Sequence, residues 1–431
     1  QLELELKDLK IETCYRRPRL CRLVMKSFHR SAHFVPFLDL GHAPPSNSYL
    51  SGPAAIATEK TYPLVIRTCT DCWLTQTEDF TDREEFFSAD YAYFSSFSTS
   101  WLEHARTYVE AMRARFGLGA DSLVCEVAAN DGYLLRHVKA AGIPCYGIEP
   151  TASTARAARA LGVDIVEEFF GAQLAGQLSG DGRQADLIAA NNVLAHVPDI
   201  NDFARGFALL LKPDGVATFE FPHLLEMVQG SQFDTAYHEH YSYLSLMAVE
   251  AVFRIAGLRV FDVEITPWHG GSLRVFACRD GASHAESAAV AAMRMRERDA
   301  GMDRADFYTG FQSEAERVRD EFLGFLAEAR AQGLRVAAYG AAAKGNTLLN
   351  FAGVTADDIA FVVDKNPAKQ GRLLPGSHIP IVDEAHLIAE KPDRVVILPW
   401  NIESEIRTQL SCIADWGGMF VTAVPKLTIH P

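Results

Sequence analysis

Two histidines, a glutamate and two tyrosines occupy five consecutive positions, residues 237–241, in the order Tyr-His-Glu-His-Tyr. An imidazole beside a carboxylate suits proton removal, because each group tunes the pKa of the other. We therefore predict that the segment 237–241 takes part in catalysis by removing a proton. A metal site and a polar loop are the two alternatives, and no third metal ligand is evident in the segment.

Three further side chains could stabilise the negative charge that such a base creates. His196 follows a predicted strand at residues 187–191, and parallel sheets bind ligands at this carboxyl edge. Tyr91 and Tyr93 precede a serine-rich run. Each could donate a hydrogen bond to an oxygen on which charge develops. A structural histidine and loop packing are the respective alternatives.

The stretch 124–135, VCEVAANDGYLL, predicts a buried strand, a loop of small residues and a helix that starts near Tyr133. Glu126 ends this strand, and Glu149 ends the next. The layout suits an adenosine-containing ligand, because small residues let the backbone approach and the second acid accepts the ribose hydroxyls. Asp131 would repel a pyrophosphate, so we expect the sulfonium S-adenosylmethionine rather than NAD. The predicted contacts are Glu126, Ala128, Asn130, Asp131, Gly132, Glu149, Asn191 and Asn192.

A second strand–loop–helix pattern carries the sequence GAAAKGN at residues 340–346. Its backbone amides and Lys344 could hold a phosphate, although the loop lacks the Walker spacing. We predict a nucleotide-diphosphate contact there, with an ordinary strand–helix turn as the alternative. The glycine-rich loop at residues 269–274 could act as a lid or phosphate contact, or be a simple hairpin turn. The predicted substrate-binding residues are His269, Gly270, Lys344 and Asn346.

Four of the eight cysteines lie in the first 80 residues. Cys69 and Cys72 form a C-x-x-C pair of the kind found in structural zinc sites. A second pair is incomplete, because Val24 stands where another cysteine would follow Cys21. We predict structural zinc, with a set of small buried thiols as the alternative. The candidate ligands are Cys14, Cys21, Cys69 and Cys72, and His29 or His33 could replace one of them.

Strand and helix patterns alternate across residues 120–280 and again across 334–425, which predicts two α/β units with doubly wound sheets. Residues 1–80 are expected to be irregular, and residues 283–333 to form one or two long helices. Another helix is expected at residues 101–116. The predicted strands cover residues 123–127, 144–148, 187–191, 215–221, 258–265, 272–278, 334–339, 359–363 and 394–398.

Composition narrows the class of protein. The chain has 431 residues, 48% of them hydrophobic and 22% charged, which is ordinary for a globular protein of two or three domains. A formal net charge of -14 argues against a nucleic-acid partner. We find neither a membrane-length apolar run nor a signal peptide, and the cysteine content suggests a reducing cytoplasm. A monomer or small homo-oligomer is expected.

Taken together, the motifs resemble those of sugar C-methyltransferases that act on nucleotide-linked 4-keto-deoxysugars. The markers include EVAANDGYLL, NNVLAHVPDI, YHEHYSYLS, HGGSLRV and YGAAAKGN, and the likeness covers nearly the whole chain. The resemblance implies a zinc-binding domain at residues 1–80, a class I methyltransferase domain at 81–280 and a helical and Rossmann-like domain at 281–431. It places the sugar nucleotide between the last two. The catalytic residues that it implies are His240, Glu239, Tyr237, His196 and one of Tyr91 and Tyr93, and on this basis we predict that His240 is the general base and that Glu239 orients it.

The implied reaction is C-methylation at carbon 3 or 5 of the sugar through an enolate, in the biosynthesis of deoxysugars or antibiotic sugars. Removal of a proton beside a ketone needs no metal, so the zinc would be structural. An O- or N-methyltransferase that acts on a small molecule is the alternative with the same fold. A nucleotide-sugar oxidoreductase with NAD at residues 340–346 and a zinc-knuckle interaction protein are alternatives from other classes.

Overall fold

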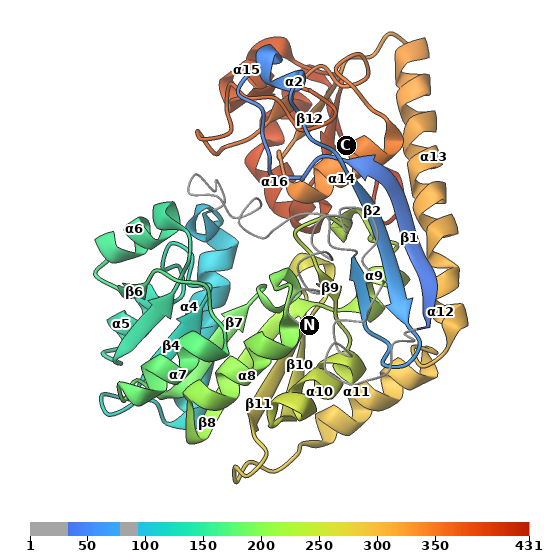
Figure 1. Cartoon of the computed structure of the whole chain (residues 1–431). Coiled ribbons are helices and arrows are strands. Elements are labelled where there is room, and N and C mark those ends of the chain that lie inside the picture. Colours follow the sequence, from blue (N-terminus) through green and yellow to red (C-terminus); the bar gives the residue numbers. More distant parts are fainter. Residues whose placement is uncertain (1–32, 78–93, 431) are drawn as a thin grey trace, which may run out of the picture.

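The computed structural model describes residues 33–77 and 94–430 and arranges them around three β-sheets (Figure 1). One sheet belongs mainly to the N-terminal part, a larger one to the centre of the chain and a third to the C-terminal part. Within these described residues, no helix is both long and apolar enough to cross a membrane.

The central sheet has seven strands and the order of a class I methyltransferase. All its strands are parallel except the second in spatial order, which runs antiparallel to both of its neighbours. The predicted fold class is therefore confirmed. In spatial order the strands are β10 (Leu258–Thr266), β11 (Ser272–Arg279), β8 (Leu211–Pro222), β7 (Ala185–Asn191), β4 (Val124–Val127), β5 (Cys145–Ile148) and β6 (Asp164–Val166).

Helices cover both faces of this sheet, and each face has its own apolar core. The helices on one face are α4 (Thr99–Phe116), α5 (Leu135–Ala140) and α6 (Ala152–Ala160). Those on the other face are α7 (Ala172–Gly180), α8 (Ile200–Leu210), α10 (Leu246–Ala256) and α11 (Ala288–Asp299). Because the sheet is buried on both sides, its central strands are almost continuously apolar, which is why the sequence revealed them.

The C-terminal sheet has six strands, of which only the last is antiparallel to its neighbour. It confirms the second α/β unit expected from the sequence. In spatial order its strands are β14 (Ile381–Val382), β13 (Val362–Val363), β12 (Val336–Tyr339), β15 (Arg394–Ile397), β16 (Met419–Thr422) and β17 (Thr428–His430). The associated helices are α14 (Ala343–Ala352), α15 (Glu384–Glu390) and α16 (Glu403–Gln409).

The described N-terminal residues are not irregular, which corrects the expectation from the sequence. They form an antiparallel sheet of β1 (Phe34–Ala43), β2 (Tyr62–Cys69) and β3 (Thr75–Thr77), completed by β9 (Ser242–Tyr243). Register shifts in β1 interrupt the strand alternation that a sequence pattern would need. The pairing with β9 joins segments more than 160 residues apart, so only the tertiary fold could reveal it.

The N-terminal sheet shares an apolar core with the C-terminal part of the chain. Phe37 on β1 stacks on Phe311, with ring centroids 4.7 Å apart. Phe311 begins α13 (Phe311–Ala331), the long helix beside the blue hairpin in Figure 1. The stretch expected to hold one or two long helices holds two, α11 and α13, with the short helix α12 (Ala305–Thr309) between them.

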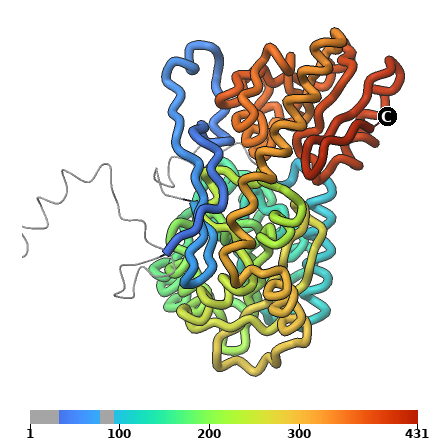
Figure 2. Tube along the Cα trace, turned by 90° about the vertical axis from the view of Figure 1, so that its right-hand side faces the viewer, coloured from blue at the N-terminus to red at the C-terminus, as the bar shows by residue number. Residues whose placement is uncertain are grey.

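The loop between β1 and β2 carries the short helix α2 (Pro53–Ile56) and reaches the C-terminal part near α15 (Figure 1). Seen from the side, this blue loop rises next to the orange C-terminal segment (Figure 2). The N-terminal sheet and its loop are thus packed against the C-terminal part of the chain. The division into domains at residues 80 and 280 stays a prediction.

Candidate functional site

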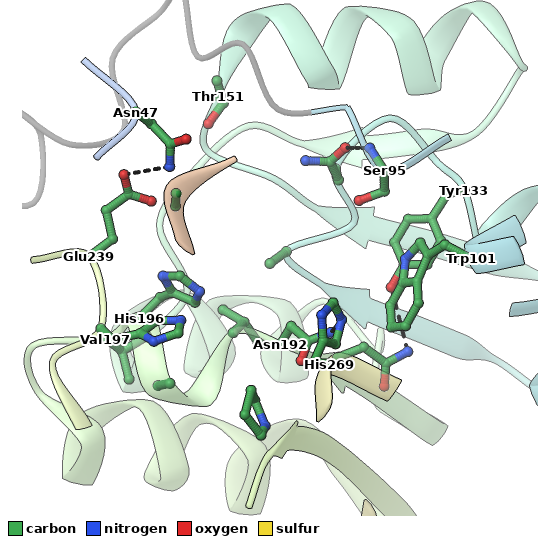
Figure 3. Close-up of a pocket in the computed structure, with 18 of the residues that line it drawn as sticks. Asn47, Ser95, Trp101, Tyr133, Thr151, Asn192, His196, Val197, Glu239 and His269 are labelled. Atoms are coloured by element: carbon green, nitrogen blue, oxygen red, sulfur yellow. Dashed lines mark hydrogen bonds between the residues drawn. The ribbon is translucent and has the colours of Figure 1, made fainter. Parts of the chain in front are cut away.

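A cavity of about 450 Å³ lies where loops from all three sheets meet (Figure 3). The carboxyl ends of β4, β5 and β7 form one side, as expected for a doubly wound sheet. The segment before β9 and the start of α14 supply further lining residues. Its lining includes Asn47, Trp101, Ala128, Asn130, Glu149, Asn191, Asn192, His196, Tyr237, Glu239, His240, His269, Lys344 and Lys369.

The loop after β4 turns sharply because several of its residues adopt the left-handed conformation. Ala128, Asn130 and Gly132 have φ values of 61°, 48° and 78°. A Cβ at Gly132 would also lie 3.2 Å from the Cβ of Ala158, so glycine lets the loop approach α6. The small residues thus bring the backbone of this loop to the cavity wall.

Glu149 follows β5 and lines the cavity with a carboxylate that is already oriented. Its two oxygens accept hydrogen bonds from the backbone amides of Asn130 and Thr151, both at 2.9 Å. Burial raises the pKa of this carboxyl, and the bonds from Thr151 and Asn130 oppose that effect. A carboxylate oriented in this way at the cavity wall suits a pair of ribose hydroxyls, to which it can only act as acceptor.

The other residues predicted to bind the methyl donor divide into two groups. Ala128, Asn130, Asn191 and Asn192 line the cavity with Glu149. Glu126, Asp131 and Gly132 do not.

Glu126 is fully buried behind the wall, and burial raises its pKa well above the usual range. Asp131 accepts hydrogen bonds from the backbone amide, at 3.1 Å, and the hydroxyl of Ser96. Asp131 therefore ties the loop to Ser96, and direct contact of either acid with a ligand stays a prediction.

Three rings of the predicted catalytic group cluster on the cavity wall. The His240 ring lies 3.9 Å from the Tyr237 ring and 4.6 Å from the His196 ring, measured between centroids. His240 Nδ1 lies 3.0 Å from the carbonyl oxygen of Thr235. Because a carbonyl can only accept, Nδ1 is the donor and Nε2 carries the lone pair. His240 therefore has the tautomer that a base at Nε2 requires.

Burial keeps both histidines of this cluster neutral. It lowers the pKa of His240 well below the usual range, and the nearby His196 lowers it further. Burial lowers the pKa of His196 to about 4, against the opposing effect of a hydrogen bond with the Glu239 backbone. Near pH 7 the site therefore offers a neutral base and a neutral ring that can share hydrogen bonds.

Glu239 lies on the same wall, and its carboxylate is held by a residue that sequence reasoning missed. Its Oε1 accepts a hydrogen bond from Asn47 Nδ2 at 2.7 Å (Figure 3). The Thr235 carbonyl, rather than this carboxylate, orients His240 through Nδ1. His238 does not line the cavity, since its Nε2 bonds the backbone oxygen of Tyr62 at 3.2 Å. The last two predicted catalytic residues, Tyr91 and Tyr93, lie outside the described residues.

Two lysines from the C-terminal part complete the wall. Lys344 donates to the backbone oxygen of His269 at 3.2 Å and to Asn401 Oδ1 at 3.3 Å. Burial lowers its pKa, and the charge of Asp234 opposes that change. Lys369, which sequence reasoning missed, donates to the carbonyl of Ala341 at 2.7 Å. The sequence feature that could have identified Lys369 is its position five residues after Asp364, an acid that ends a predicted strand.

The remaining predicted substrate contacts lie in different places. His269 lines the cavity, and its Nε2 lies 3.0 Å from Asn192 Nδ2. Gly270 does not line the cavity, and a Cβ there would lie 2.5 Å from the Trp400 ring. Asn346 is buried and donates to the backbone oxygen of Ser46 at 2.6 Å. The roles of these residues in binding substrate stay predictions.

Cys69 and Cys72 lie in a tight turn between β2 and β3. The turn is closed by a hydrogen bond of 2.7 Å from the Trp73 amide to the Cys69 carbonyl, and Trp73 has a φ of 60°. No group of three or more metal-ligating side chains occurs among the residues that the structure describes. Cys14 and Cys21 lie outside those residues, so zinc binding stays a prediction.

Three family models match successive parts of the chain. Residues 28–87 match a family model described as "Putative zinc binding domain", residues 101–263 one described as "Methyltransferase domain", and residues 267–425 one described as "C-methyltransferase C-terminal domain". The first match includes Cys69 and Cys72 but begins after Cys21.

The chain is also similar to one curated protein and to several solved structures. It is 33% identical to the C-methyltransferase NovU of Streptomyces niveus over 393 residues, which cover 91% of this chain and 93% of that protein. A magnesium protoporphyrin IX methyltransferase from Synechocystis PCC 6803 with bound SAM matches 41% of this chain and 79% of its own, with 16% identity and a TM-score of 0.32. An S-adenosylmethionine-dependent methyltransferase from Clostridium acetobutylicum matches 41% of this chain and 92% of its own, with 11% identity and a TM-score of 0.33.

Proposed function

Given that the chain belongs to the S-adenosylmethionine-dependent C-methyltransferases, we propose that its methyl acceptor is a nucleotide-diphosphate-linked 4-keto-deoxysugar. The observation that carries this proposal is that three kinds of functional group line one and the same cavity. Glu149 offers a ribose-binding carboxylate, His240 a proton acceptor, and Lys344 and Lys369 offer two ammonium groups. These groups would bind, respectively, the ribose of the methyl donor, the proton beside the ketone and the diphosphate of the sugar nucleotide.

In the proposed reaction, His240 Nε2 takes the proton from carbon 3 or 5, next to the ketone. The electron pair of the broken C–H bond then forms the enolate, whose oxygen accepts hydrogen bonds from His196 and Tyr237. The enolate carbon forms a bond to the methyl carbon as the bond from that carbon to sulfur breaks. S-adenosylmethionine supplies the methyl group, and the proton stays on His240 until solvent removes it.

Tyr91 and Tyr93 remain candidates for a further hydrogen bond to the enolate oxygen. We place the reaction in the biosynthesis of deoxysugars, including those of antibiotics, because that chemistry supplies 4-keto sugar nucleotides. The cytoplasm is the proposed compartment.

We also propose that zinc has a structural role in the N-terminal sheet. Cys69 and Cys72 supply two thiolates from one turn, and the remaining ligands would be Cys14 and Cys21, with His29 or His33 as substitutes. Thiolate pairs of this kind fix small turn-rich segments. No step of the proposed reaction requires the metal.

Hydrogen exchange tests the base and the acceptor together. The wild-type protein is incubated with 4-keto sugar nucleotides in deuterated water without a methyl donor, and the carbon beside the ketone is followed by NMR. We expect deuterium to enter that carbon. His240→Ala should lose both exchange and methylation by roughly 10²–10⁴. His238→Ala is the matched control, because this neighbouring ring does not line the cavity.

Near-normal methylation by His240→Ala would show that another group removes the proton, with Tyr237 as the next candidate. Methylation of a hydroxyl or amine in the same panel, without exchange beside a ketone, would favour an O- or N-methyltransferase. Product mass spectrometry with each acceptor separates these outcomes.

A further inference from the structure

The loop between β1 and β2, residues 44–61, is fastened to the C-terminal part at both ends; we call this loop the arm. Leu50 and Leu373 exchange two backbone hydrogen bonds, of 3.0 and 2.9 Å. Nearer β2, the Glu59 carboxylate accepts bonds from the Gly376 amide at 2.9 Å and from His378 Nε2 at 2.7 Å. The path of the arm over the C-terminal part is visible in Figures 1 and 2.

The arm is held most closely on the two sides of Asn47. The carbonyl of Ser46 accepts a bond of 2.6 Å from Asn346 Nδ2, and both residues are buried. The hydroxyl of Tyr49 donates to the carbonyl of Ala341 at 2.6 Å. Because both partners belong to α14 or the loop before it, the backbone at Asn47 has little freedom to move.

The same helix also holds the segment that carries the predicted catalytic residues. Thr347 Oγ1, one residue after Asn346, donates to the carbonyl of Ala236 at 2.7 Å. Ala236 directly precedes Tyr237. Helix α14 therefore fixes the distance between the arm and residues 237–241.

Asn47 spans that distance with its side chain. Its amide donates to Glu239 Oε1 at 2.7 Å, and both residues line the cavity. Figure 3 shows the Glu239 carboxylate turned toward Asn47. The Thr235 carbonyl meanwhile orients His240 without help from this carboxylate.

From this arrangement we infer that Asn47 is a positioning residue, which turns the Glu239 carboxylate away from His240 so that it binds a hydroxyl group of the acceptor. The inference rests on the proposed function for the identity of that acceptor. A carboxylate held at one oxygen by a neutral amide still has lone pairs for a sugar hydroxyl. Among the described residues, the other charged or titratable groups near this side of the cavity include Tyr49, Tyr237, Lys344, Lys369, His196 and His240.

Steady-state kinetics of Asn47→Ala test the positioning role. We expect the KM for the 4-keto sugar nucleotide to rise about tenfold or more, because a charge-assisted contact loses its orientation. The KM for S-adenosylmethionine should change by less than about twofold, since Glu149 keeps both of its backbone donors. Exchange of the acceptor proton at saturating acceptor should persist, because His240 keeps its bond to Thr235.

Ser48→Ala is the matched control, since Ser48 is the exposed neighbour of Asn47 on the same arm. Asn346→Ala is a second route to the same effect, because it leaves the Asn47 side chain intact and releases Ser46. An unchanged acceptor KM in both Asn47→Ala and Asn346→Ala would overturn the inference. Equal rises in the KM of both substrates would also overturn it, since they would indicate general loss of structure.

A stability cycle tests the contact without any acceptor. Asn47→Asp places two carboxylates together, so the melting temperature should fall, and the fall should shrink at acidic pH as one carboxyl takes a proton. In the double variant with Glu239→Gln, the amide at position 239 can donate a hydrogen bond to the carboxylate at position 47. The double variant should therefore recover most of the lost melting temperature, while its turnover stays low. If the two changes are simply additive, the inference fails. If they are coupled but the wild type methylates no 4-keto sugar nucleotide, only the proposed acceptor fails.

Discussion

Glu149 shows how a single carboxylate can be prepared for a ligand by the backbone around it. The amides of Asn130 and Thr151 fix the plane of the carboxylate, so little side-chain entropy remains to be lost on binding. This is the position at which the sequence pattern and the geometry of the cavity agree most closely.

We expect Glu149→Ala to weaken S-adenosylmethionine binding at least tenfold, because each charge-assisted bond to a ribose hydroxyl contributes about 1.5–3 kcal/mol. Isothermal titration calorimetry measures the effect. Glu167→Ala is the matched control, since Glu167 is an exposed acid just after the neighbouring strand β6. Unchanged affinity in a folded Glu149→Ala protein would contradict the assignment.

The depressed pKa of His240 leads to a prediction about pH. A base must be unprotonated, and a pKa well below 6.5 keeps His240 unprotonated in neutral and mildly acidic solution. At saturating S-adenosylmethionine, kcat/KM for the acceptor should therefore stay level as the pH falls to about 6.5, and decline only below it. A decline centred above pH 7 would point to a different base.

At the scale of elements, two strand–loop–helix units face each other across the cavity. We propose that the loop after β4 serves the methyl donor, and the first turn of α14 presents Lys344. The side chain of Lys344 lies 4.6 Å above the Trp400 ring, which restricts its position. An ammonium group fixed in this way suits the diphosphate of a sugar nucleotide.

Lys344→Ala should raise the KM for the sugar nucleotide about tenfold or more and leave the KM for S-adenosylmethionine nearly unchanged. Initial-rate measurements with each substrate varied in turn test this. Lys365→Ala is a suitable control, because Lys365 is an exposed lysine of the same α/β unit. A parallel rise for both substrates would indicate a damaged fold or a different phosphate site.

At the scale of the whole molecule, the N-terminal sheet is part of the core of the C-terminal half. Cys69 begins the turn that joins β2 to β3, and β3 pairs with β9 directly after residues 237–241. A change in that turn should therefore affect both the stability of the protein and the arrangement of the cavity.

If zinc holds the turn, metal analysis should find about one zinc per chain in the purified protein. Cys69→Ser should lose the metal and lower the melting temperature, because the binding energy of a structural metal contributes to folding. Cys412→Ser, which changes a cysteine in the C-terminal part, should keep both the metal and the melting temperature of the wild type. A protein that is free of metal as purified, yet folded and active, would contradict zinc binding.

The sequence by itself determined the elements whose signal is local. The buried strands β4, β5 and β7, the acid at Glu149 and the Tyr-His-Glu-His-Tyr segment were all recognisable, because sheet burial and proton chemistry leave dense patterns in adjacent residues. The class I fold and the C-methyltransferase family followed from those patterns. The strands β13 and β14 are only two residues long, so their pairing depends on neighbours rather than on propensity.

Only the tertiary structure decided which side chains meet. Asn47 reaches Glu239 across 192 positions of sequence, and Lys369 joins Lys344 on one wall through the fold of the C-terminal sheet. In the segment 237–241 the family resemblance pointed to His240, and only the structure shows that His240 faces the cavity whereas His238 does not. The physical reason is that side-chain direction and pKa depend on burial and hydrogen-bond partners, and these partners come from distant parts of the chain.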